Sequence, residues 1–506
     1  MAQPFPFNVG TIHIIGIGGI GMSGYAEILH NLGYKVQGSD QSENANVQRL
    51  RDLGITVHIG HDAKNVVDDQ GNPASVVVKS TAVKDDNPEI ISARVRDIPV
   101  IPRVDLLAEL MRAKWCVNIS GTHGKTTTTS MIGHVLEKAG LDPTVINGGI
   151  INAYGSNTRL GASKWMVVES DESDGTFAQL PSVASVITNI DPEHLDYYGS
   201  FDKLKDAFVK YAQNLPFYGV LVACVDHPVV EELLPRFNRR TITYGFSEKA
   251  DLQAVNVKTT PSGLTFDIKV NNPKLDKFPT EITGIKLPMF GKHNVLNALS
   301  AFGVGHDAGI PAEKIAAALG QFAGVKRRFT ITGTVNGVTV IDDYGHHPVE
   351  IAAVLRAGRD ALDGAEPRKD GSKGKIVAVI QPHRYTRLQN LFDDFAKCVG
   401  DADEVIIAPV YEAGEKPIEG INRDTLVAAI KKLGKNNVTA LEKPEDLAGL
   451  VAARAQSGDF VICLGAGSIT HWANNLPREL AALAPAADAK RKIANTKNGQ
   501  PPSSDL

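Results

Sequence analysis

The chain has 506 residues, of which 43% are hydrophobic and 22% charged, and its formal net charge is −4. At roughly 100 to 200 residues per domain, this length predicts about three domains. The small negative charge disfavours nucleic acid and anionic membranes as partners, because both require a large basic surface. Small molecules are therefore the expected ligands.

Other signals narrow the class of protein further. No apolar run reaches the roughly 18 residues of a membrane-spanning helix, so we expect no contact with a membrane. The segment Met1–Gly10 lacks the basic head and apolar stretch of a secretory signal, which predicts a cytoplasmic protein. Four isolated cysteines without a C-x-x-C pair disfavour both a disulfide framework and a zinc site.

Three times along the chain, a β-branched run is followed by a glycine-containing turn and a helical pattern. This is the repeating unit of parallel α/β proteins. We expect the units to begin at Thr11–Gly16, at Cys116–Ser120 and after Arg328, and residues 251–290 to form antiparallel strands. The predicted fold class is α/β with three domains, and the predicted bounds are residues 1–111, 112–326 and 327–484, followed by a disordered tail at 485–506.

The first unit contains a glycine-rich loop between a strand and a helix. The loop carries Gly16, Gly18, Gly19 and Gly21, and Asp40 follows about twenty residues later at the end of the next strand. Backbone amides of such a loop approach a pyrophosphate, and the helix N-terminus favours negative charge. Taken alone, the pattern fits NAD, another diphosphate nucleotide, or glycines that serve packing only.

The second unit contains a stronger phosphate signal, Gly121-Thr122-His123-Gly124-Lys125-Thr126-Thr127, directly after a predicted strand. Successive amides can surround the β and γ phosphates of ATP, Lys125 can neutralise them, and the Thr126 hydroxyl can join a magnesium shell. The loop is two residues shorter than G-x-x-x-x-G-K-[ST]. We expect it to be exposed. A dehydrogenase does not need such a loop.

Acidic and imidazole side chains follow the next two predicted strands. Glu169 ends the strand Trp165–Val168 and opens a cluster that includes Asp171, Glu172 and Asp174. Because parallel strands present ligands at their carboxyl ends, Glu169 is the expected magnesium ligand. The other three acids fit a solvated loop equally well. His194 follows a later strand at the same edge, where we expect it to serve a second metal or a phosphate.

Together, these residues resemble the Mur ligases of peptidoglycan synthesis, and the resemblance spans nearly the whole chain. It rests on eight ordered blocks, which are Gly16–Gly24 (GIGGIGMSG), Gly121–Thr127 (GTHGKTT), Glu169–Asp174 (ESDESD), Asp191–Asp196 (DPEHLD), Phe290–Asn297 (FGKHNVLN), Lys326–Phe329 (KRRF), Asp342–Pro348 (DDYGHHP) and Gln381–Arg387 (QPHRYTR). The resemblance implies a Rossmann-like UDP-sugar domain, a central P-loop ATPase-type domain and a C-terminal Rossmann-like domain.

The resemblance also implies roles for individual residues. Lys125, Glu169 and His194 correspond to catalytic residues, and Thr126, Glu169 and His194 to metal ligands. Residues that correspond to further ATP contacts are Asn294, Asn297, Arg328 and Asp343, although the asparagines also fit a helix-stabilising role and Arg328 a hinge ion pair. Residues that correspond to an amino-acid pocket, where guanidinium groups hold a carboxylate, are Tyr344, His346, Arg384 and Arg387. Ser39, Asp40 and Ser80 correspond to UDP contacts.

The implied reaction is the ATP-dependent joining of L-alanine to the carboxylate of UDP-N-acetylmuramate. It implies two Mg²⁺ ions, for which Mn²⁺ can substitute. Several relatives carry a carbamylated lysine after the position of His194; here that position holds Val209, with Lys210 adjacent, so we expect none. Whether the chain is a monomer or a homodimer stays open. The alternatives are a recycling ligase that attaches a whole peptide, an NAD-dependent oxidoreductase and a non-catalytic nucleotide-binding module.

Overall fold

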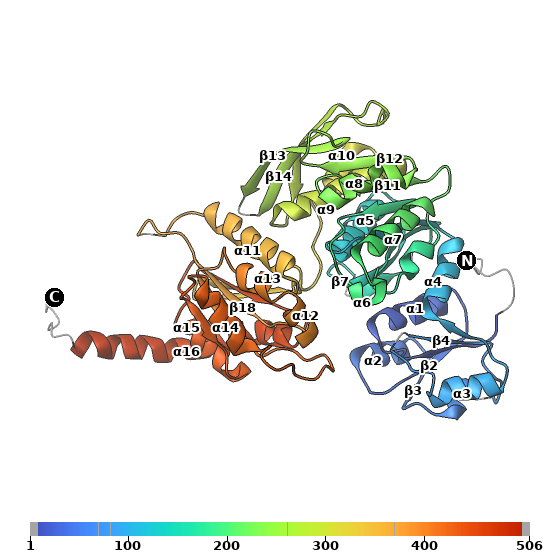
Figure 1. Ribbon diagram of the computed structural model, residues 1–506, viewed down its shortest axis with the longest axis horizontal. Helices are drawn as coiled ribbons and strands as arrows, with labels where there is room; N and C mark the ends of the chain where they lie inside the picture. Colours follow the sequence, from blue (N-terminus) through green and yellow to red (C-terminus); the bar gives the residue numbers. More distant parts are fainter. Residues whose placement is uncertain are drawn as a thin grey trace. The chain divides into compact units, whose positions relative to one another are not determined.

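The structure is a computed structural model that describes residues 9–68, 70–80, 82–154, 156–260, 262–368 and 370–497, without the side chains of residues 20 and 484–497. Three sheets of five, ten and six strands follow one another along the chain (Figure 1). Most strand pairs within them are parallel. The predicted α/β fold class with three sheet-centred parts is confirmed.

The first sheet is entirely parallel, with the order β3-β2-β1-β4-β5. Its strands are β1 (Ile12–Ile15), β2 (Val36–Asp40), β3 (Thr56–Ile59), β4 (Val76–Lys79) and β5 (Val100–Pro102). Its helical segments are α1 (Ile20–Asn31), α2 (Ala45–Asp52), η1 (Ala63–Val66), α3 (Pro88–Val95) and α4 (Arg103–Arg112). This arrangement puts the glycine-rich loop and Asp40 at the carboxyl ends of adjacent strands, as predicted.

The second sheet has the order β15-β14-β13-β12-β11-β10-β6-β9-β7-β8. Its strands are β6 (Trp115–Ser120), β7 (Thr144–Ile151), β8 (Ser156–Arg159), β9 (Trp165–Glu169), β10 (Ala184–Ile187), β11 (Val220–Cys224), β12 (Thr241–Gly245), β13 (Leu252–Thr260), β14 (Gly263–Val270) and β15 (Glu281–Leu287). Only two residues separate the neighbours β13 and β14 in the sequence, so the pair is an antiparallel hairpin. The antiparallel insert predicted for residues 251–290 begins with this hairpin.

Helices cover the second sheet, and two of them, α5 and α8, begin at the edge where its parallel strands end. The helical segments are α5 (Lys125–Lys138), η2 (Thr176–Gln179), α6 (Leu195–Tyr198), α7 (Phe201–Gln213), α8 (Pro228–Phe237), α9 (Lys292–Asp307) and α10 (Ala312–Leu319). Helix α5 starts five residues after the end of β6, and α8 starts four residues after the end of β11. Because β6, β9, β10 and β11 are parallel, the loops that follow them meet at one edge.

The third sheet has the order β16-β17-β21-β18-β19-β20, in which only the β16–β17 pair is antiparallel. Its strands are β16 (Thr330–Val335), β17 (Val338–Asp343), β18 (Ile376–Ile380), β19 (Glu404–Ile407), β20 (Val438–Ala440) and β21 (Phe460–Leu464). Its helical segments are α11 (Pro348–Asp363), α12 (Tyr385–Asn390), α13 (Phe392–Lys397), α14 (Arg423–Lys432), η3 (Pro444–Asp446), α15 (Leu447–Ala452) and α16 (Ile469–Lys497).

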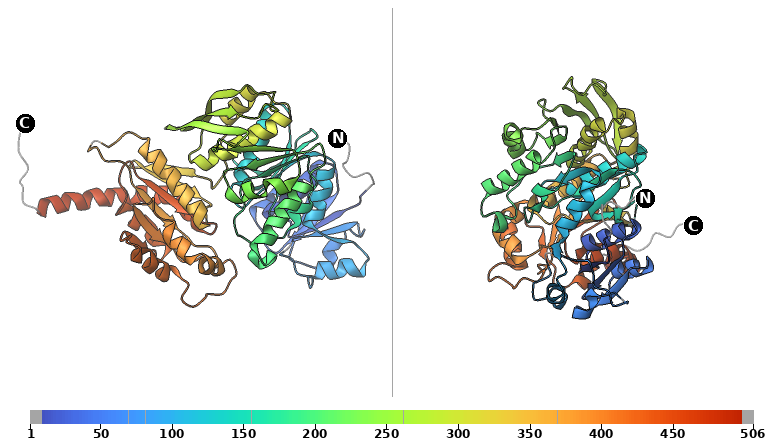
Figure 2. Two further views of the ribbon diagram at one scale, coloured as in Figure 1. Left: turned by 45° about the horizontal axis from the view of Figure 1, so that its top comes forward. Right: turned by 90° about the vertical axis from the view of Figure 1, so that its right-hand side faces the viewer.

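Helices lie on both faces of the third sheet, as the views in Figures 1 and 2 show. Residues of α11, α13 and α14 form one buried apolar cluster with the sheet, and residues of α15 and α16 form another. A sheet covered on both faces explains why its strands are continuous apolar runs. Helix α16 extends into the segment 485–506 that we predicted to be disordered, and residues 498–506 lie outside the described residues.

The chain folds into two compact units. The first comprises Met1–Val257, Thr265–Pro288 and His293–Val325, and the second comprises Lys258–Leu264, Met289–Lys292 and Lys326–Leu506. Within the first unit, Ile14 and Val36 of the first sheet share one buried cluster with Ile146, Met166 and Val168 of the second. These two sheets therefore pack as one body. Among the described helices, each is too short or too polar to cross a bilayer.

Candidate functional site

The loop between β6 and α5 has a backbone that only glycine adopts readily. Gly121 has φ +134° and Gly124 has φ +85°. A Cβ on Gly121 would lie 2.1 Å from the Thr188 hydroxyl, and one on Gly124 would lie 2.9 Å from Oδ1 of Asn297. The loop ends at the N-terminus of α5, where unpaired amides and the helix dipole favour an anion. The structure thus gives this loop a conformation and a position that suit the predicted binding of phosphate.

Residues after β10 hold this loop from outside. The amide of His123 donates to Oδ1 of Asn189 at 2.7 Å, and its carbonyl accepts from Thr188 Oγ1 at 2.7 Å and from Asn189 Nδ2 at 3.0 Å. The amide of Asp191 donates to Thr122 Oγ1 at 2.8 Å. These hydrogen bonds fix the conformation of the loop. The sequence did not predict a role for Asn189 or Asp191.

Lys125 has a buried acidic partner, and the expectation that it lies on an exposed loop is wrong. Its Nζ donates to Gly121 O at 2.7 Å and to the two carboxylate oxygens of Glu172 at 3.0 and 2.8 Å. The Lys125 side chain is 14% exposed and that of Glu172 is 1% exposed. Burial opposes the charge on Lys125, but the carboxylates of Glu172 and Asp171 outweigh it and raise the pKa of Lys125.

Thr126 and Glu169 meet at the carboxyl ends of β6 and β9. Thr126 Oγ1 donates to Oε1 of Glu169 at 3.1 Å, and the Gly148 amide donates to Oε2 at 2.8 Å. A Cβ on Gly148 would lie 2.5 Å from this carboxylate, so the glycine lets the backbone approach it. A hydroxyl beside a carboxylate is a ligand pair that Mg²⁺ accepts. The structure brings these two predicted metal ligands together.

A second group of possible metal ligands lies beside Lys125. One ligand atom each from Asp171, Glu172 and His194 lies within 4.8 Å of the others. His194 adopts a left-handed conformation with φ +56°, and its Nε2 lies 4.0 Å from Oε1 of Glu172. The hydroxyl of Tyr198 donates to the Glu172 carbonyl at 2.5 Å. Glu172 is thus a buried site residue, which the sequence left open because acidic clusters are also common in solvated loops.

The position expected for a carbamylated lysine lies in an apolar environment. Val209 is buried in a cluster with Phe208 and Leu204 on α7, and the adjacent Lys210 is exposed.

Two asparagines of α9 support the phosphate loop from the opposite side. Thr128 Oγ1 donates to Oδ1 of Asn297 at 3.1 Å, and Asn297 Nδ2 donates to Oδ1 of Asn294 at 3.1 Å. Both asparagines are buried. This chain of hydrogen bonds connects α9 to α5 directly behind Gly124. It places both predicted residues next to the loop, in a supporting position.

The glycine-rich loop of the first sheet is hydrogen-bonded to Asp40 at the end of the next strand. The Gly18 amide donates to Oδ2 of Asp40 at 2.8 Å, so the carboxylate that a ribose would use is already bound to the loop. Gly16 has φ +75°, and a Cβ there would lie 3.8 Å from Ser80 Oγ. The structure brings Gly16, Gly18, Asp40 and Ser80 to one edge of the first sheet.

Ser39 supports this loop but does not present its hydroxyl to it. The Ser39 carbonyl accepts from the amides of Gly16 and Ile17 at 2.8 and 3.0 Å. Its hydroxyl donates to the buried carboxylate of Glu89 at 2.6 Å. The Ser39 side chain is fully buried in a polar network of the first sheet, and the expected contact of Ser39 with the UDP moiety stays a prediction.

In the second unit, Asp343 ends β17 and is buried. Its two carboxylate oxygens each accept a hydrogen bond of 2.7 Å, one from the Phe329 amide and one from the Gly345 amide. Burial raises the pKa of Asp343 to about 6, against the opposing charge of Arg328. The guanidinium carbons of Arg327 and Arg328 lie 4.7 and 5.4 Å from the ring centre of Tyr344. Arg328, Asp343 and Tyr344 thus form one group.

A row of aromatic side chains continues from Tyr344. Its ring centre lies 5.1 Å from that of His346, which lies 5.7 Å from that of His383. His383 in turn stacks on Tyr411 at 5.4 Å. Burial and the charges of His346, Arg387 and Arg384 lower the pKa of His383 to about 4, so all four groups are close neighbours. The sequence motif contained His383, but its role was not predicted.

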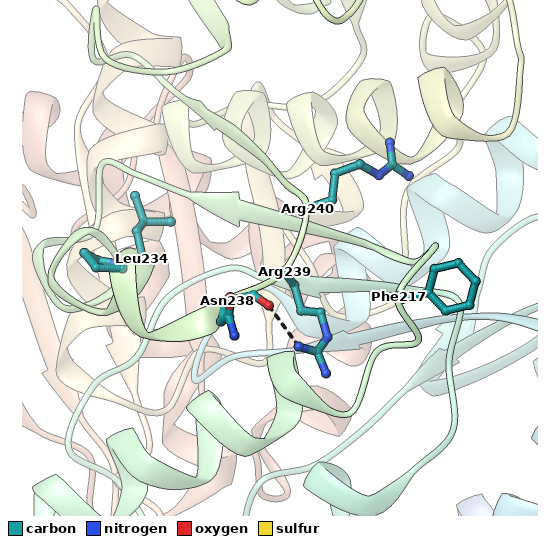
Figure 3. Close-up of a pocket in the computed structure, with 6 residues that line it drawn as sticks. Phe217, Leu234, Asn238, Arg239 and Arg240 are labelled. Carbon is teal, nitrogen blue, oxygen red and sulfur yellow. Dashed lines mark hydrogen bonds between the residues drawn. The ribbon is translucent and has the colours of Figure 1, made fainter.

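A separate surface hollow lies at the other end of α8 (Figure 3). Phe217 stands on its rim and is 94% exposed. Its two arginines already have partners, because Arg239 donates to Leu215 O at 2.8 Å and to Asn238 O at 2.9 Å, and Arg240 binds Asp307 through two bonds of 2.7 and 2.6 Å. The hollow lacks the phosphate-binding features of the loop after β6.

Three family models match consecutive parts of the chain. The Mur ligase family catalytic domain matches residues 11–115, the Mur ligase middle domain matches 119–305, and the Mur ligase glutamate ligase domain matches 327–467. The chain belongs to the Mur ligase family. The three matched regions of this Mur ligase correspond to its three sheets, each with its own set of candidate site residues.

Individual Mur ligases resemble the chain over almost its full length. The UDP-N-acetylmuramate–L-alanine ligase of Parvibaculum lavamentivorans is 55% identical over 500 residues, which cover 99% of both chains. The solved UDP-N-acetylmuramate–alanine ligase of Thermotoga maritima is 30% identical, with a TM-score of 0.75 over 93% of this chain and 99% of the other. A solved murein peptide ligase of Psychrobacter arcticus is 23% identical, with a TM-score of 0.64 over 93% of this chain and 99% of the other. This similarity shows that the two chains share a fold.

Proposed function

We propose that this Mur ligase joins L-alanine to UDP-N-acetylmuramate at the expense of ATP, giving UDP-N-acetylmuramoyl-L-alanine, ADP and phosphate for peptidoglycan synthesis. The observation that carries the proposal is the phosphate loop with Lys125 and the Thr126–Glu169 pair at one sheet edge. The choice of sugar and amino acid is supported by the relatives that carry this activity in their names at 55% identity.

The chemistry requires activation of the sugar carboxylate, because a carboxylate is a poor electrophile. A carboxylate oxygen attacks the γ phosphorus of ATP, ADP leaves, and an acyl phosphate forms. The neutral amine of L-alanine then attacks the acyl carbon, and the C–O bond to phosphate breaks. The amine loses a proton in this step. The sequence and fold do not assign the base.

The chain's own residues supply positioning and charge. The amides at the start of α5 and the ammonium of Lys125 bind the phosphates and offset the repulsion between two anions. Thr126 and Glu169 fit one Mg²⁺, and Asp171, Glu172 and His194 fit a second, since both groups offer hard or imidazole ligands at close range. Bound Mg²⁺, or Mn²⁺ in its place, would neutralise charge on the phosphoryl oxygens.

The remaining site residues divide by domain. For residues 1–111 we propose binding of the UDP moiety by the loop Gly16, Gly18, Gly19 and Gly21, with Asp40 and Ser80 beside it. For residues 112–326 we propose binding of ATP, with Thr122, His123, Thr127, Asn294 and Asn297 as supporting positions. For residues 327–484 we propose ATP contacts by Arg328 and Asp343.

For the amino acid we propose a pocket formed by Tyr344, His346, Arg384 and Arg387. It is supported by the row of rings from Tyr344 through His346 to His383 and by the two arginines that lower the pKa of His383. Guanidinium groups bind a carboxylate in a planar, bidentate manner, which suits the free carboxylate of L-alanine. The function implies a cytoplasmic protein with small-molecule partners, as a monomer or homodimer.

Phosphate release from ATP tests the whole proposal. The purified protein is assayed with Mg²⁺ and UDP-N-acetylmuramate, with and without L-alanine, and the sugar product is identified by mass. We expect release that requires both substrates and an adduct heavier by one alanyl residue. Release with L-alanyl-γ-D-glutamyl-diaminopimelate but not with L-alanine would replace the proposal by the recycling reaction. Absence of release with either acceptor would refute the substrate assignment.

A further inference from the structure

A carboxylate outside the predicted site lies between two imidazoles. Oδ2 of Asp191 lies 3.3 Å from Nε2 of His123, and Nε2 of His227 donates to Oδ1 of Asp191 at 3.3 Å. All three side chains are partly buried, with exposures of 28% for Asp191, 14% for His123 and 19% for His227. The two imidazoles hold the pKa of Asp191 well below its usual range, so the carboxylate is charged at neutral pH.

One end of this group is the phosphate loop itself. His123 is the third residue of the loop, and Asp191 also contacts the second, because its amide donates to Thr122 Oγ1 at 2.8 Å. The Asp191 carboxylate and amide therefore contact two consecutive loop residues. A shift of Asp191 would move both of them.

His227, at the other end of this group of three side chains, is fixed to a different part of the second sheet. His227 precedes α8, directly after Asp226, whose carboxylate accepts from the amides of Phe246 and Ser247 at 2.7 and 2.9 Å. A Cβ on Gly245 would lie 2.1 Å from the same carboxylate, so the backbone packs closely around it. These contacts leave the backbone of His227 little freedom, and the imidazole is a fixed donor for Asp191.

The imidazole of His227 does not stabilise the helix that follows it by capping. It makes no capping hydrogen bond to α8. Within the described residues its Nδ1 is buried without a hydrogen-bond partner. Donation from Nε2 to Asp191 suits this position, because a proton on Nδ1 would be a buried donor without an acceptor. The one polar contact of the ring shown by the structure is therefore the one to Asp191.

We propose that His227 is a positioning residue for ATP. Through Asp191 it holds Thr122 and His123 in the conformation that receives the phosphates. His227 belongs to none of the eight motif blocks and does not itself reach the phosphate loop. The inference rests on the proposed binding of ATP by this loop, and a preformed loop saves the ordering cost that a mobile loop would impose on binding.

Two substitutions of His227 separate positioning from packing. His227→Phe keeps a planar ring but removes the donor, whereas His227→Gln keeps an amide donor near the place of Nε2. For the Phe variant we expect the KM for ATP to rise about tenfold, the effect of losing one hydrogen bond to a charged group. We expect kcat and the KM values for the sugar and L-alanine to change less than about twofold, and the Gln variant to recover most of the ATP affinity.

Binding of ADP, measured by calorimetry on the full chain, provides a readout independent of turnover. We expect the wild type and His227→Gln to bind more tightly than His227→Phe, with melting temperatures alike. An unchanged KM for ATP and unchanged ADP affinity in His227→Phe would overturn the inference. So would equal losses for all substrates together with a lower melting temperature, which would show a packing role. A wild type that does not bind ADP would instead refute the proposed function.

A control variant addresses the general effect of replacing a histidine in the first unit. His30 lies in the last turn of α1, in the part of the first unit that carries the first sheet. His30→Phe should leave the KM for ATP and the ADP affinity at the wild-type values. A rise equal to that of His227→Phe would show that the effect is not transmitted through Asp191, and would overturn the inference.

Discussion

The ammonium of Lys125 lies 2.8 Å from a carboxylate oxygen of Glu172, which is almost fully buried. The lysine that the loop offers to phosphate is thus already paired with a negative charge. ATP must compete with Glu172 for this ammonium or bind beside the pair. The pairing also gives Lys125 a structural role that the loop sequence does not reveal.

Lys125→Ala should therefore have two effects. We expect turnover to fall by several orders of magnitude, because a charge that stabilises the transferring phosphoryl group is lost. We also expect the free energy of unfolding to fall by about 3 kcal/mol, because the buried Glu172 carboxylate loses its partner. Urea unfolding of the nucleotide-free protein measures the second effect, and phosphate release measures the first.

The double variant Lys125→Ala/Glu172→Gln separates these effects. Since the glutamine carries no charge, we expect most of the lost stability to return, while turnover does not rise above that of Lys125→Ala because Glu172 is also a proposed Mg²⁺ ligand. A single variant as stable as the wild type would contradict the importance of the buried pair. Near-normal turnover in the single variant would contradict the phosphate-loop assignment.

Glu169→Gln tests the proposed magnesium ligand. The amide oxygen of glutamine can still accept from the Gly148 amide, so we expect stability to change by less than about 1 kcal/mol. The loss of a charged ligand should raise the Mg²⁺ concentration for half-maximal turnover by about tenfold or more. Turnover at increasing Mg²⁺ concentration, at fixed ATP, measures the shift.

A control variant replaces a glutamate that lies away from the Thr126–Glu169 pair. Glu404 precedes the buried part of β19, in the second unit. Glu404→Gln should keep the wild-type dependence on Mg²⁺. If Glu169→Gln also keeps it, Glu169 is not a metal ligand, and its role is limited to holding Thr126 and Gly148.

Glu169 and Glu172 differ in how well the sequence predicts their positions. The position of Glu169 at the sheet edge was predictable, because it ends an apolar run and parallel strands present their carboxyl ends to ligands. Glu172 follows in an acidic loop, and its burial depends on Tyr198 and Lys125, which come from other segments. Such tertiary contacts leave no periodic pattern in the sequence.

The same reasoning explains other differences. The contact between Asp191 and His227 joins two residues 36 positions apart in separate loops, and no motif links them. Short strands such as β5 (Val100–Pro102) have too few residues for a clear alternation. By contrast, the phosphate loop combines strand, glycine turn and helix within a few residues. Local patterns of this kind were correctly predicted.

Arg384 and Arg387 are expected to bind the carboxylate of L-alanine. Arg387→Lys keeps the charge but loses the planar pair of donors, so we expect the KM for L-alanine to rise about tenfold, with the KM for ATP and for the sugar unchanged. Arg356→Lys, an exposed arginine of α11, is the control and should leave all three values unchanged. An unchanged KM for L-alanine in Arg387→Lys would remove Arg387 from the pocket.

Arg384 requires a different substitution, because its backbone has φ +70°. A side chain with a Cβ is strained there, so Arg384→Ala would keep the strain and remove the guanidinium. We expect Arg384→Ala to raise the KM for L-alanine without lowering stability. Arg384→Gly should raise the KM equally, and any gain of stability in Gly over Ala reports the released strain. Equal KM values for wild type and both variants would exclude Arg384 from the pocket.

His383 should make stability depend on pH. Its pKa is lowered to about 4 in the folded protein by burial and by the charges of His346, Arg387 and Arg384, whereas an unfolded histidine has a pKa of about 6.5. Between these values the unfolded chain binds more protons, so the free energy of unfolding should fall as the pH falls from about 6.5 to 4. Above that window His383 makes no pH-dependent contribution.

Urea unfolding of the wild type and of His383→Gln at several pH values isolates this contribution. The two unfolding midpoints should differ by a constant amount above about pH 7, and the difference should change in favour of the variant as the pH falls toward 4. Arg387→Gln removes one of the charges that lower the pKa of His383, and should therefore weaken the pH dependence. If wild type and His383→Gln lose stability in parallel across the window, the imidazole is not held neutral in the folded protein.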